Sequence, residues 1–126
     1  MTDLEIRTLQ EAAIVATGGT PGGPRPGCVE GSLGAATSAA LYTSDGEPDP
    51  FVFAAYLLIY LARNHCFPDG NKRVAWLSFV DVLRTDLNAT LELPATTTAS
   101  FVEEVAQGRV SVDQVLRFFA PHLRSC

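Results

Sequence analysis

Apolar residues recur at helical spacing in several segments of the chain, and Gly and Pro separate these segments. Near the N-terminus, Thr2 and Glu5 have the spacing of a capping box. Apolar residues then recur three or four positions apart until Gly18 and Gly19, where we expect the first helix to end. A loop rich in Gly and Pro follows over 18–27, and the spacing from Val29 to Ala40 predicts a second helix.

The middle of the chain holds its most apolar segment. A polar turn is expected over 42–48, and Asp49 followed by Pro50 looks like an N-cap with proline at the first helical position. The helix predicted from there to about Asn64 is apolar on every face, so it should lie in the centre of the core. A buried strand could also be apolar all round, but the run is too long for a typical strand.

The C-terminal half shows three further helical patterns. A turn over 68–71 precedes an amphipathic helix predicted over 71–86. A short extended piece is expected over 90–93 and a short helix over 98–107. A last helix should begin at the capping box of Ser111 and Gln114, with a buried face made by Val112, Val115, Leu116, Phe119 and Leu123. The pattern predicts an all-α fold, a compact bundle of about six helices in a single domain over 1–126.

Composition narrows the class of protein. The 126 residues are 47% apolar and 18% charged, which is enough for one hydrophobic core. The net charge of −5 argues against direct binding of nucleic acid or of an anionic membrane surface. The N-terminus lacks the order of a signal peptide, and the longest apolar run, 51–62, is too short to span a bilayer. We therefore expect a soluble cytoplasmic protein.

The three cysteines, Cys28, Cys66 and Cys126, are widely spaced and form no C-x-x-C pair. Neither a disulfide framework nor a zinc knuckle is indicated. Reduced thiols in a cytosol are the simplest interpretation.

The nine residues that begin at His65 combine groups that could handle a phosphate. A helix start offers unpaired N–H groups and a positive dipole end, and Gly70 permits close approach of an anion. Lys72 and Arg73 are unfavourable at that end unless an anion binds there. Asp69 offers oxygen ligands for Mg²⁺, which usually arrives with phosphates. His65 can accept a proton near neutral pH.

Each of these features taken alone is more often structural. Pro-Asp-Gly-Asn is a common turn in which Asn71 would be a good N-cap. A histidine at a helix end is often a cap or a packed residue, and Lys-Arg pairs are usually solvated. Their coincidence within one short segment favours a functional site.

The segment His-Cys-Phe-Pro-Asp-Gly-Asn-Lys-Arg resembles the H-x-F-x-[D/E]-x-N-x-R signature of the Fic/Doc family. Lys72 stands where most Fic enzymes have Gly, and Trp76 stands where they often carry a further Arg. Both features resemble the Doc (death on curing) branch. The upstream segment 25–33 also resembles the Arg-x-x-Gly-x-Leu-Glu-x-x-Leu segment of Doc-like toxins.

This resemblance implies the Fic/Doc fold and a transfer of part of ATP onto a protein hydroxyl. Most Fic enzymes move AMP, whereas Doc-like members resemble kinases that place the γ-phosphate on a threonine of elongation factor Tu and stop translation. Because Gly70 is common in AMP-transferring members, AMP transfer stays open as the alternative. A non-catalytic antitoxin-binding module of the same fold is a second alternative.

The family's roles can be carried over residue by residue. His65 would be the general base, and Asp69 would hold Mg²⁺. The phosphate cradle would be formed by Gly70, Asn71 and Lys72, and Lys72 with Arg73 would offset charge in the transition state. Phe67 is expected to be a packing anchor.

Three other features of the sequence bear on the chemistry and regulation of the site. Cys66 occupies a variable position of the signature, and no nearby motif residue could activate it as a nucleophile. A metal site of His65, Cys66 and His122 has no standard spacing. The inhibitory Ser/Thr-x-x-x-Glu-Gly/Asn motif of many Fic proteins is not found: Ser100 and Glu104 have the spacing but Val105 follows, and Glu30-Gly31 has Pro26 four places before the Glu. We therefore expect an antitoxin protein to act in trans.

Overall fold

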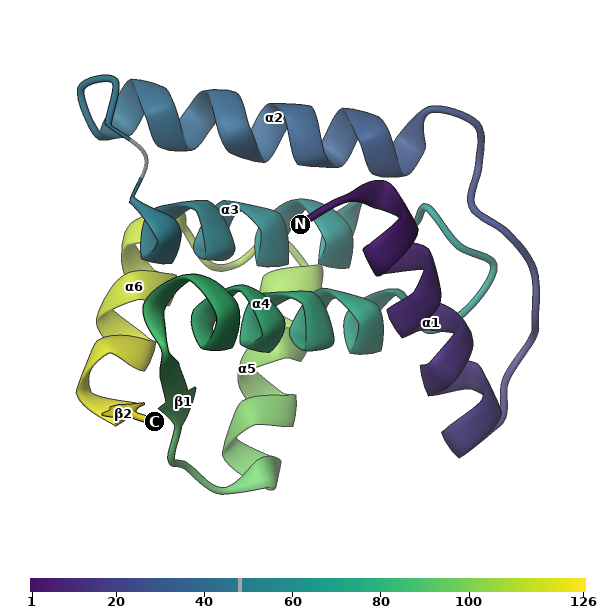
Figure 1. Cartoon of the computed structure of the whole chain (residues 1–126). Helices are drawn as coiled ribbons and strands as arrows, with labels where there is room; N and C mark the ends of the chain where they lie inside the picture. Colours follow the sequence, from purple (N-terminus) through teal and green to yellow (C-terminus); the bar gives the residue numbers. More distant parts are fainter. Residues whose placement is uncertain (48) are drawn as a thin grey trace.

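The computed structural model describes residues 1–47 and 49–126, and this part of the chain forms six α-helices and two short strands (Figure 1). The predicted all-α bundle is confirmed. The predicted turn over 42–48 ends at Pro48, which lies outside the described residues. The elements in chain order are α1 (Asp3–Thr17), α2 (Cys28–Thr43), α3 (Pro50–Arg63), α4 (Asn71–Leu87), β1 (Ala89–Leu91), α5 (Ala95–Ala106), α6 (Val112–Phe119), a 3₁₀ turn (Ala120–His122) and β2 (Leu123–Ser125).

Local capping fixes the starts of three helices as the sequence predicts. At α1, the Thr2 side chain accepts a hydrogen bond from the Glu5 N–H, and the Glu5 side chain accepts one from the Thr2 N–H. Ser111 and Gln114 make the same reciprocal pair at α6. At α3, the Asp49 carboxylate accepts hydrogen bonds from the first turn, which also contains proline. Each cap satisfies backbone donors that would otherwise lack a partner.

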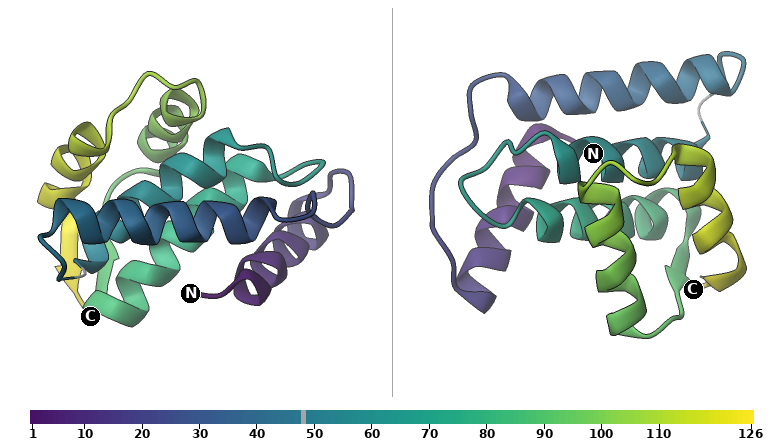
Figure 2. Two further views of the ribbon diagram at one scale, coloured as in Figure 1. Left: turned by 90° about the horizontal axis from the view of Figure 1, so that it is seen from above. Right: turned by 180° about the vertical axis from the view of Figure 1, so that it is seen from behind.

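Helix α3 lies at the centre of the fold because other helices contact it on several sides. It runs beside α4, and α2 lies along its other side (Figure 1). Helices α5 and α6 pack on a further face of the α3–α4 pair, which is turned to the reader in the right-hand view of Figure 2. The end of α3 and the start of α4 therefore meet at one end of the molecule. Among the described residues, no helix is long and apolar enough to cross a membrane.

Aromatic side chains join α4, α5 and α6. The rings of Phe79 and Phe119 are 4.9 Å apart between centroids, and those of Phe101 and Phe118 stack at 3.9 Å. Trp76 lies 5.6 Å from Phe119 and completes the group. Buried aromatic pairs of this kind contribute beyond the area that they bury. The cluster holds α5 at a fixed distance from α4, and a cavity lies between these two helices.

The C-terminal helix is shorter than predicted. It ends at Phe119, whereas the apolar spacing had indicated that it would include Leu123. Pro121 lacks an N–H and cannot continue the helical hydrogen bonding. Leu123 instead pairs with Leu91 in an antiparallel strand pair. The extended piece expected near 90–93 therefore forms a strand, and its partner strand comes from the C-terminal end of the chain. Helix α5 also begins earlier than predicted, at Ala95.

The prediction that the thiols are reduced is wrong for two of the three cysteines. Cys28 and Cys66 form a disulfide with their Cα atoms 5.4 Å apart, and Cys126 is free and exposed. The two positions are 38 residues apart in the sequence, and only the packing of α2 against α3 brings them together. Spacing alone cannot reveal such a pair. The disulfide ties the first residue of α2 to the residue after His65.

Candidate active site

All six predicted site residues line one cavity of about 1140 Å³. The loop after α3 and the start of α4 form its polar end, and α4, β1 and α5 form a more apolar wall. The polar end contains His65, Asp69, Gly70, Asn71, Lys72 and Arg73. The apolar wall contains Trp76, Val80, Leu91, Leu93, Ala99 and Val102. A concave site with a few convergent polar groups is typical of small-molecule binding.

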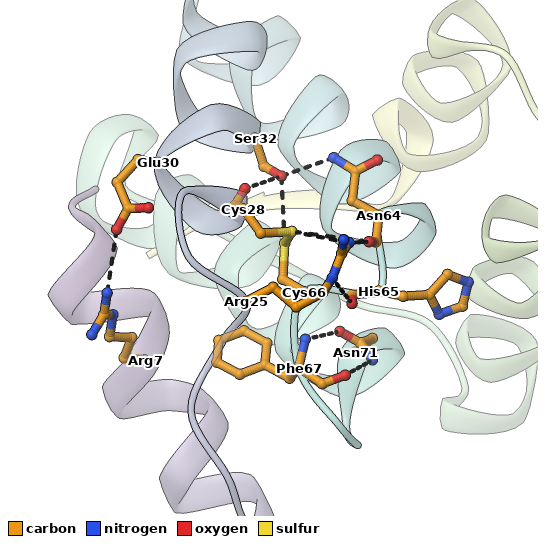
Figure 3. Close-up of a disulfide and its surroundings, with 10 residues drawn as sticks. All are labelled: Arg7, Arg25, Cys28, Glu30, Ser32, Asn64, His65, Cys66, Phe67 and Asn71. Carbon is orange, nitrogen blue, oxygen red and sulfur yellow. Dashed lines mark hydrogen bonds and ion pairs between the residues drawn. A yellow bond between two sulfur atoms is a disulfide. The ribbon is translucent and has the colours of Figure 1, made fainter.

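His65 has an unusual backbone conformation, with a φ of +50°. This left-handed region costs a non-glycine residue roughly 1–2 kcal/mol. The Arg25 Nε donates to the His65 carbonyl at 3.1 Å, and the Arg25 backbone N–H donates to the Cys66 carbonyl at 2.8 Å. The imidazole points away from the disulfide (Figure 3) and lines the cavity. It is therefore available to a substrate hydroxyl.

The start of α4 presents free backbone donors to the cavity. Gly70 is the N-cap residue, with a left-handed φ of +77°, and it has no side chain with which to cap the helix. The Gly70 N–H donates to the Asp69 carboxylate, and the N–H groups of the first helical turn lie beyond it. Lys72 and Arg73 add positive charge at the positive end of the helix dipole, and the first turn has no acidic residue. A bound anion would satisfy the donors and offset this charge.

Asn71 does not cap the helix, although its residue type had indicated that it could. Its side-chain oxygen accepts from the Phe67 N–H at 3.0 Å, and its side-chain nitrogen donates to the Phe67 carbonyl at 2.9 Å (Figure 3). This pair of bonds closes the loop between the two helices. The Phe67 side chain is only 4% exposed, which confirms its predicted role as a packing anchor.

Lys72 has a partner that the sequence did not reveal. Its ammonium lies 2.5 Å from a carboxylate oxygen of Glu103 on α5, and the Gln107 side chain donates to the other oxygen at 3.0 Å. The pKa of the Glu103 carboxyl is held below its ordinary value, mainly by the hydrogen bond from Lys72 and then by the one from Gln107. All three side chains line the cavity, so an acidic group occupies the side of Lys72 that a phosphate would approach.

Asp69 joins the loop between α3 and α4 to the segment 18–27, which we call the strap. One carboxylate oxygen accepts from the Thr20 N–H at 2.9 Å, and the other accepts from the Gly70 N–H at 2.8 Å. The strap passes so close that a Cβ on Gly19 would lie 2.6 Å from the Asp69 oxygen. The buried Gln10 of α1 donates to the Asp69 carbonyl at 3.1 Å. The position of this carboxylate is therefore set by neighbours from three segments.

The arrangement fits a magnesium ion that arrives with a polyphosphate. Each Asp69 oxygen has one hydrogen bond and keeps a lone pair, and the side chain lines the cavity. No three His, Cys, Asp or Glu side chains within residues 1–47 and 49–126 are placed to hold a metal by themselves. Mg²⁺ commonly takes one or two carboxylates and completes its shell with phosphate oxygens and water. Asp69 would be its protein ligand.

The hydrogen bonds to Asp69 predict a pH-dependent tether of the strap. The pKa of the Asp69 carboxyl is held below its ordinary value of 3.8. The largest cause is the hydrogen bond from Thr20, followed by that from Gly70, and the charge of Arg73 adds to the effect. Its contribution to stability is thus present above pH 3.8 and is lost as the pH falls through the lower folded-state pKa. The amide resonances of Thr20 and Gly70 should titrate together with a midpoint below 3.8. Separate midpoints, or one at the ordinary value, would contradict the tether.

The disulfide bears on two alternatives for Cys66. While its sulfur is bonded to Cys28, Cys66 has no thiol with which to act as a nucleophile or to join a metal site with His65 and His122. The residues that sequence reasoning missed are Gln10, Arg25, Cys28 and Glu103. Two signals pointed to Arg25: it begins the segment 25–33 that resembles Doc-like toxins, and it is the only charged residue between Glu11 and Glu30.

The fold and the site define a helical domain in which a histidine faces an uncapped helix start. A family model described as the Fic/DOC family matches residues 5–83, which is more than half of the chain. The chain therefore belongs to the Fic/DOC family. The match covers α2, α3, most of α1 and α4, and all residues from His65 to Arg73. A comparison with curated proteins found no match. Members of this family are often transferases.

Proposed function

We propose that this protein is a Doc-like toxin that transfers the γ-phosphate of ATP to a hydroxyl, expected to be a threonine, of a translation factor such as elongation factor Tu. The observation that carries the proposal is the meeting of an imidazole, a carboxylate and an uncapped, lysine-bearing helix start at one end of a cavity. The triphosphate would lie at this polar end, and the nucleoside would extend along the apolar wall.

Each residue of the site would have a separate role in phosphate transfer. His65 takes the proton of the target hydroxyl as that oxygen attacks the γ-phosphorus of ATP, and the bond to the β–γ bridging oxygen breaks so that ADP leaves. The free N–H groups at the start of α4, with Lys72 and Arg73, stabilise charge on the phosphate oxygens. Mg²⁺ bound through Asp69 would neutralise part of the polyphosphate charge. The side chains of Asn71 and Phe67 keep the loop in shape, and Asn71 would contact the phosphate through its backbone N–H.

The backbone conformation of Gly70 is relevant to the choice between phosphate transfer and AMP transfer. Its φ of +77° gives a backbone reason for glycine at this position, independent of which phosphate is transferred. Lys72 thus remains the residue that distinguishes the two chemistries, and it favours the kinase-like reaction. AMP transfer is the alternative outcome of the test below.

The test uses ATP labelled in parallel on the γ- and α-phosphates, with purified elongation factor Tu and with host lysate. Transfer of the γ-label and a mass increase of roughly 80 Da on the target support the proposal, and transfer of the α-label with roughly 330 Da supports AMP transfer. A His65→Ala protein is the matched control. If neither label is transferred, and His65→Ala leaves cellular toxicity unchanged, the protein is a non-catalytic binding module.

Glu103 gives a second prediction for this site. A polyphosphate must displace its carboxylate from Lys72, so Glu103→Gln is expected to tighten ATP binding. The gain should be roughly two- to fivefold, as expected for removing one exposed ion pair. Calorimetric titration with ATP measures the dissociation constant. Glu104→Gln is the matched control, because the neighbouring Glu104 pairs with Arg109 and does not line the cavity. Unchanged or weaker binding by Glu103→Gln would contradict the proposed phosphate position.

The proposal also names a partner and a compartment. An antitoxin acting in trans would bind the protein, and the open cavity offers it a surface. ATP and the translation machinery are in the cytoplasm, where thiols are kept reduced. Cys28 and Cys66 would be a dithiol there, and the hydrogen bonds of Arg25 would be the remaining link between the strap and His65.

A further inference from the structure

Arg25 connects the strap to the residues around His65, in addition to the contact between Thr20 and Asp69 described above. Arg25 lies near the end of this segment, and its three bonds to the loop all go to backbone carbonyls. Its Nε donates to His65, its Nη2 donates to Asn64, and its own N–H donates to Cys66. Figure 3 shows the guanidinium between the end of α3 and the disulfide, with the imidazole on the other side.

The carbonyls of Asn64 and His65 lie at the end of α3, where a helix needs external hydrogen-bond donors. Helix α3 ends at Arg63, Asn64 is its C-cap, and the last carbonyls of a helix have no intrahelical donor. They also form the negative end of the helix dipole, which favours a cation. The fork of a guanidinium can donate to two carbonyls at once, as Arg25 does here. The contact therefore fixes the last peptide of α3 and the first peptide of the loop together.

The conformation of His65 depends on these peptides. The chain leaves α3 through a left-handed residue, and a histidine adopts that conformation only where its surroundings hold it. Rotation of the next peptide would turn the His65 carbonyl away from Arg25 and would swing the imidazole relative to the cavity. The Arg25 side chain opposes this rotation through its bond to the His65 carbonyl. The Arg25 backbone N–H adds a bond to the Cys66 carbonyl, which Arg25→Ala would keep.

We propose that Arg25 is a positioning residue that holds His65 in its left-handed conformation, so that the imidazole faces the cavity. The proposal rests on the proposed function of His65 as general base. Arg25 itself does not line the cavity, and its guanidinium is engaged with the protein backbone. It is therefore not placed to bind ATP.

The disulfide holds the same peptide by an independent route. Cys66 is bonded through sulfur to Cys28, three positions after Arg25. In the oxidised protein the covalent bond limits the movement of the loop when Arg25 is removed. In the reduced protein Arg25 is the main restraint. The effect of losing Arg25 should consequently be larger under reducing conditions.

The experiment compares Arg25→Ala and Arg25→Lys with the unmodified protein, each with and without dithiothreitol. Arg117→Ala is the control, because Arg117 is a solvent-exposed arginine that pairs with Asp113 on the same helix, α6. Arg25→Ala is expected to lower kcat by about tenfold or more under reducing conditions, since small misplacements of a catalytic group have large effects on rate. The KM for ATP should stay within about twofold of the value for the unmodified protein, because the protein groups that would bind the phosphates are unchanged. Arg25→Lys, or millimolar guanidinium added to Arg25→Ala, should restore part of kcat.

A second readout does not depend on activity. The backbone coupling constant and Cα chemical shift of His65, measured by NMR, report directly whether its φ is positive. Arg25→Ala should lose this signature in the reduced protein, whereas Arg117→Ala should keep it. If the unmodified protein transfers no label, the proposed function fails, and the NMR result still decides whether Arg25 sets the conformation of His65.

Two results would overturn the proposal. One is a reduced Arg25→Ala protein that keeps the left-handed signature of His65 and full kcat. The other is a rise in the KM for ATP with kcat unchanged, which would make Arg25 a substrate-binding residue. If Arg25→Ala fails to fold, Arg25→Lys serves in its place, because it keeps the charge at the helix end and loses the two-pronged contact.

Discussion

Replacing His65 with glutamine is expected to lower kcat for phosphate transfer by about 10²–10⁴-fold, the usual contribution of a general base. Glutamine keeps much of the size and polarity of the side chain but cannot take a proton near neutral pH. The groups that would hold the phosphates, at the start of α4, are untouched. The KM for ATP should therefore change little. Initial rates with γ-labelled ATP and the target protein measure both constants.

The second histidine of the chain provides the control. His122 lies in the 3₁₀ turn after α6, with its ring 6.2 Å from that of Phe118, and it does not line the cavity. His122→Gln should keep wild-type kcat. A folded His65→Gln protein with wild-type kcat would show that the imidazole is not the base, whatever the reaction.

Breaking the Cys28–Cys66 disulfide is expected to lower the free energy of unfolding by about 4 kcal/mol. This value follows from the 38-residue separation, because the bridge restricts the unfolded chain in proportion to the logarithm of the loop length. The corresponding fall in melting temperature is roughly 10–20 °C for a domain of this size. Chemical unfolding with and without dithiothreitol, followed by circular dichroism, measures the difference.

Two variants make this measurement specific. Cys28→Ser removes the bridge and leaves Cys66, which is only 1% exposed, as a buried thiol. Its unfolding should match that of the reduced wild-type protein. Cys126→Ser changes the free, exposed cysteine and should have no effect. Equal midpoints for oxidised and reduced wild-type protein would show that the bridge adds nothing to stability.

Most of the fold could be predicted because its signals are local. The capping residues Thr2, Asp49 and Ser111 mark helix starts within a few positions of the side chains that they serve. The prediction failed at the C-terminus, where Leu123 continues a helical spacing but belongs to a strand. Its partner Leu91 is distant in the sequence, and apolar periodicity carries no information on such pairing.

In the candidate site, too, local features could be predicted and contacts between distant residues could not. The residues from His65 to Arg73 are consecutive, so their types and order could be interpreted without a structure. The contacts that position them come from elsewhere: Gln10 from α1, Arg25 and Cys28 from around the strap, and Glu103 from α5. A single sequence does not show which distant residues meet. The sequence thus indicated the groups that act, and the structure was needed to show which residues orient them.

The pairing of the two strands links the end of the chain to the cavity wall. Leu91 lines the cavity and faces Leu123 across the strand pair, and the Glu92 N–H donates to the His122 carbonyl at 3.0 Å. A nucleotide that packs against Leu91 would bind only the form in which β2 is docked. By thermodynamic linkage, occupancy of the cavity would then slow the fraying of the C-terminal segment, even though that segment never touches the ligand.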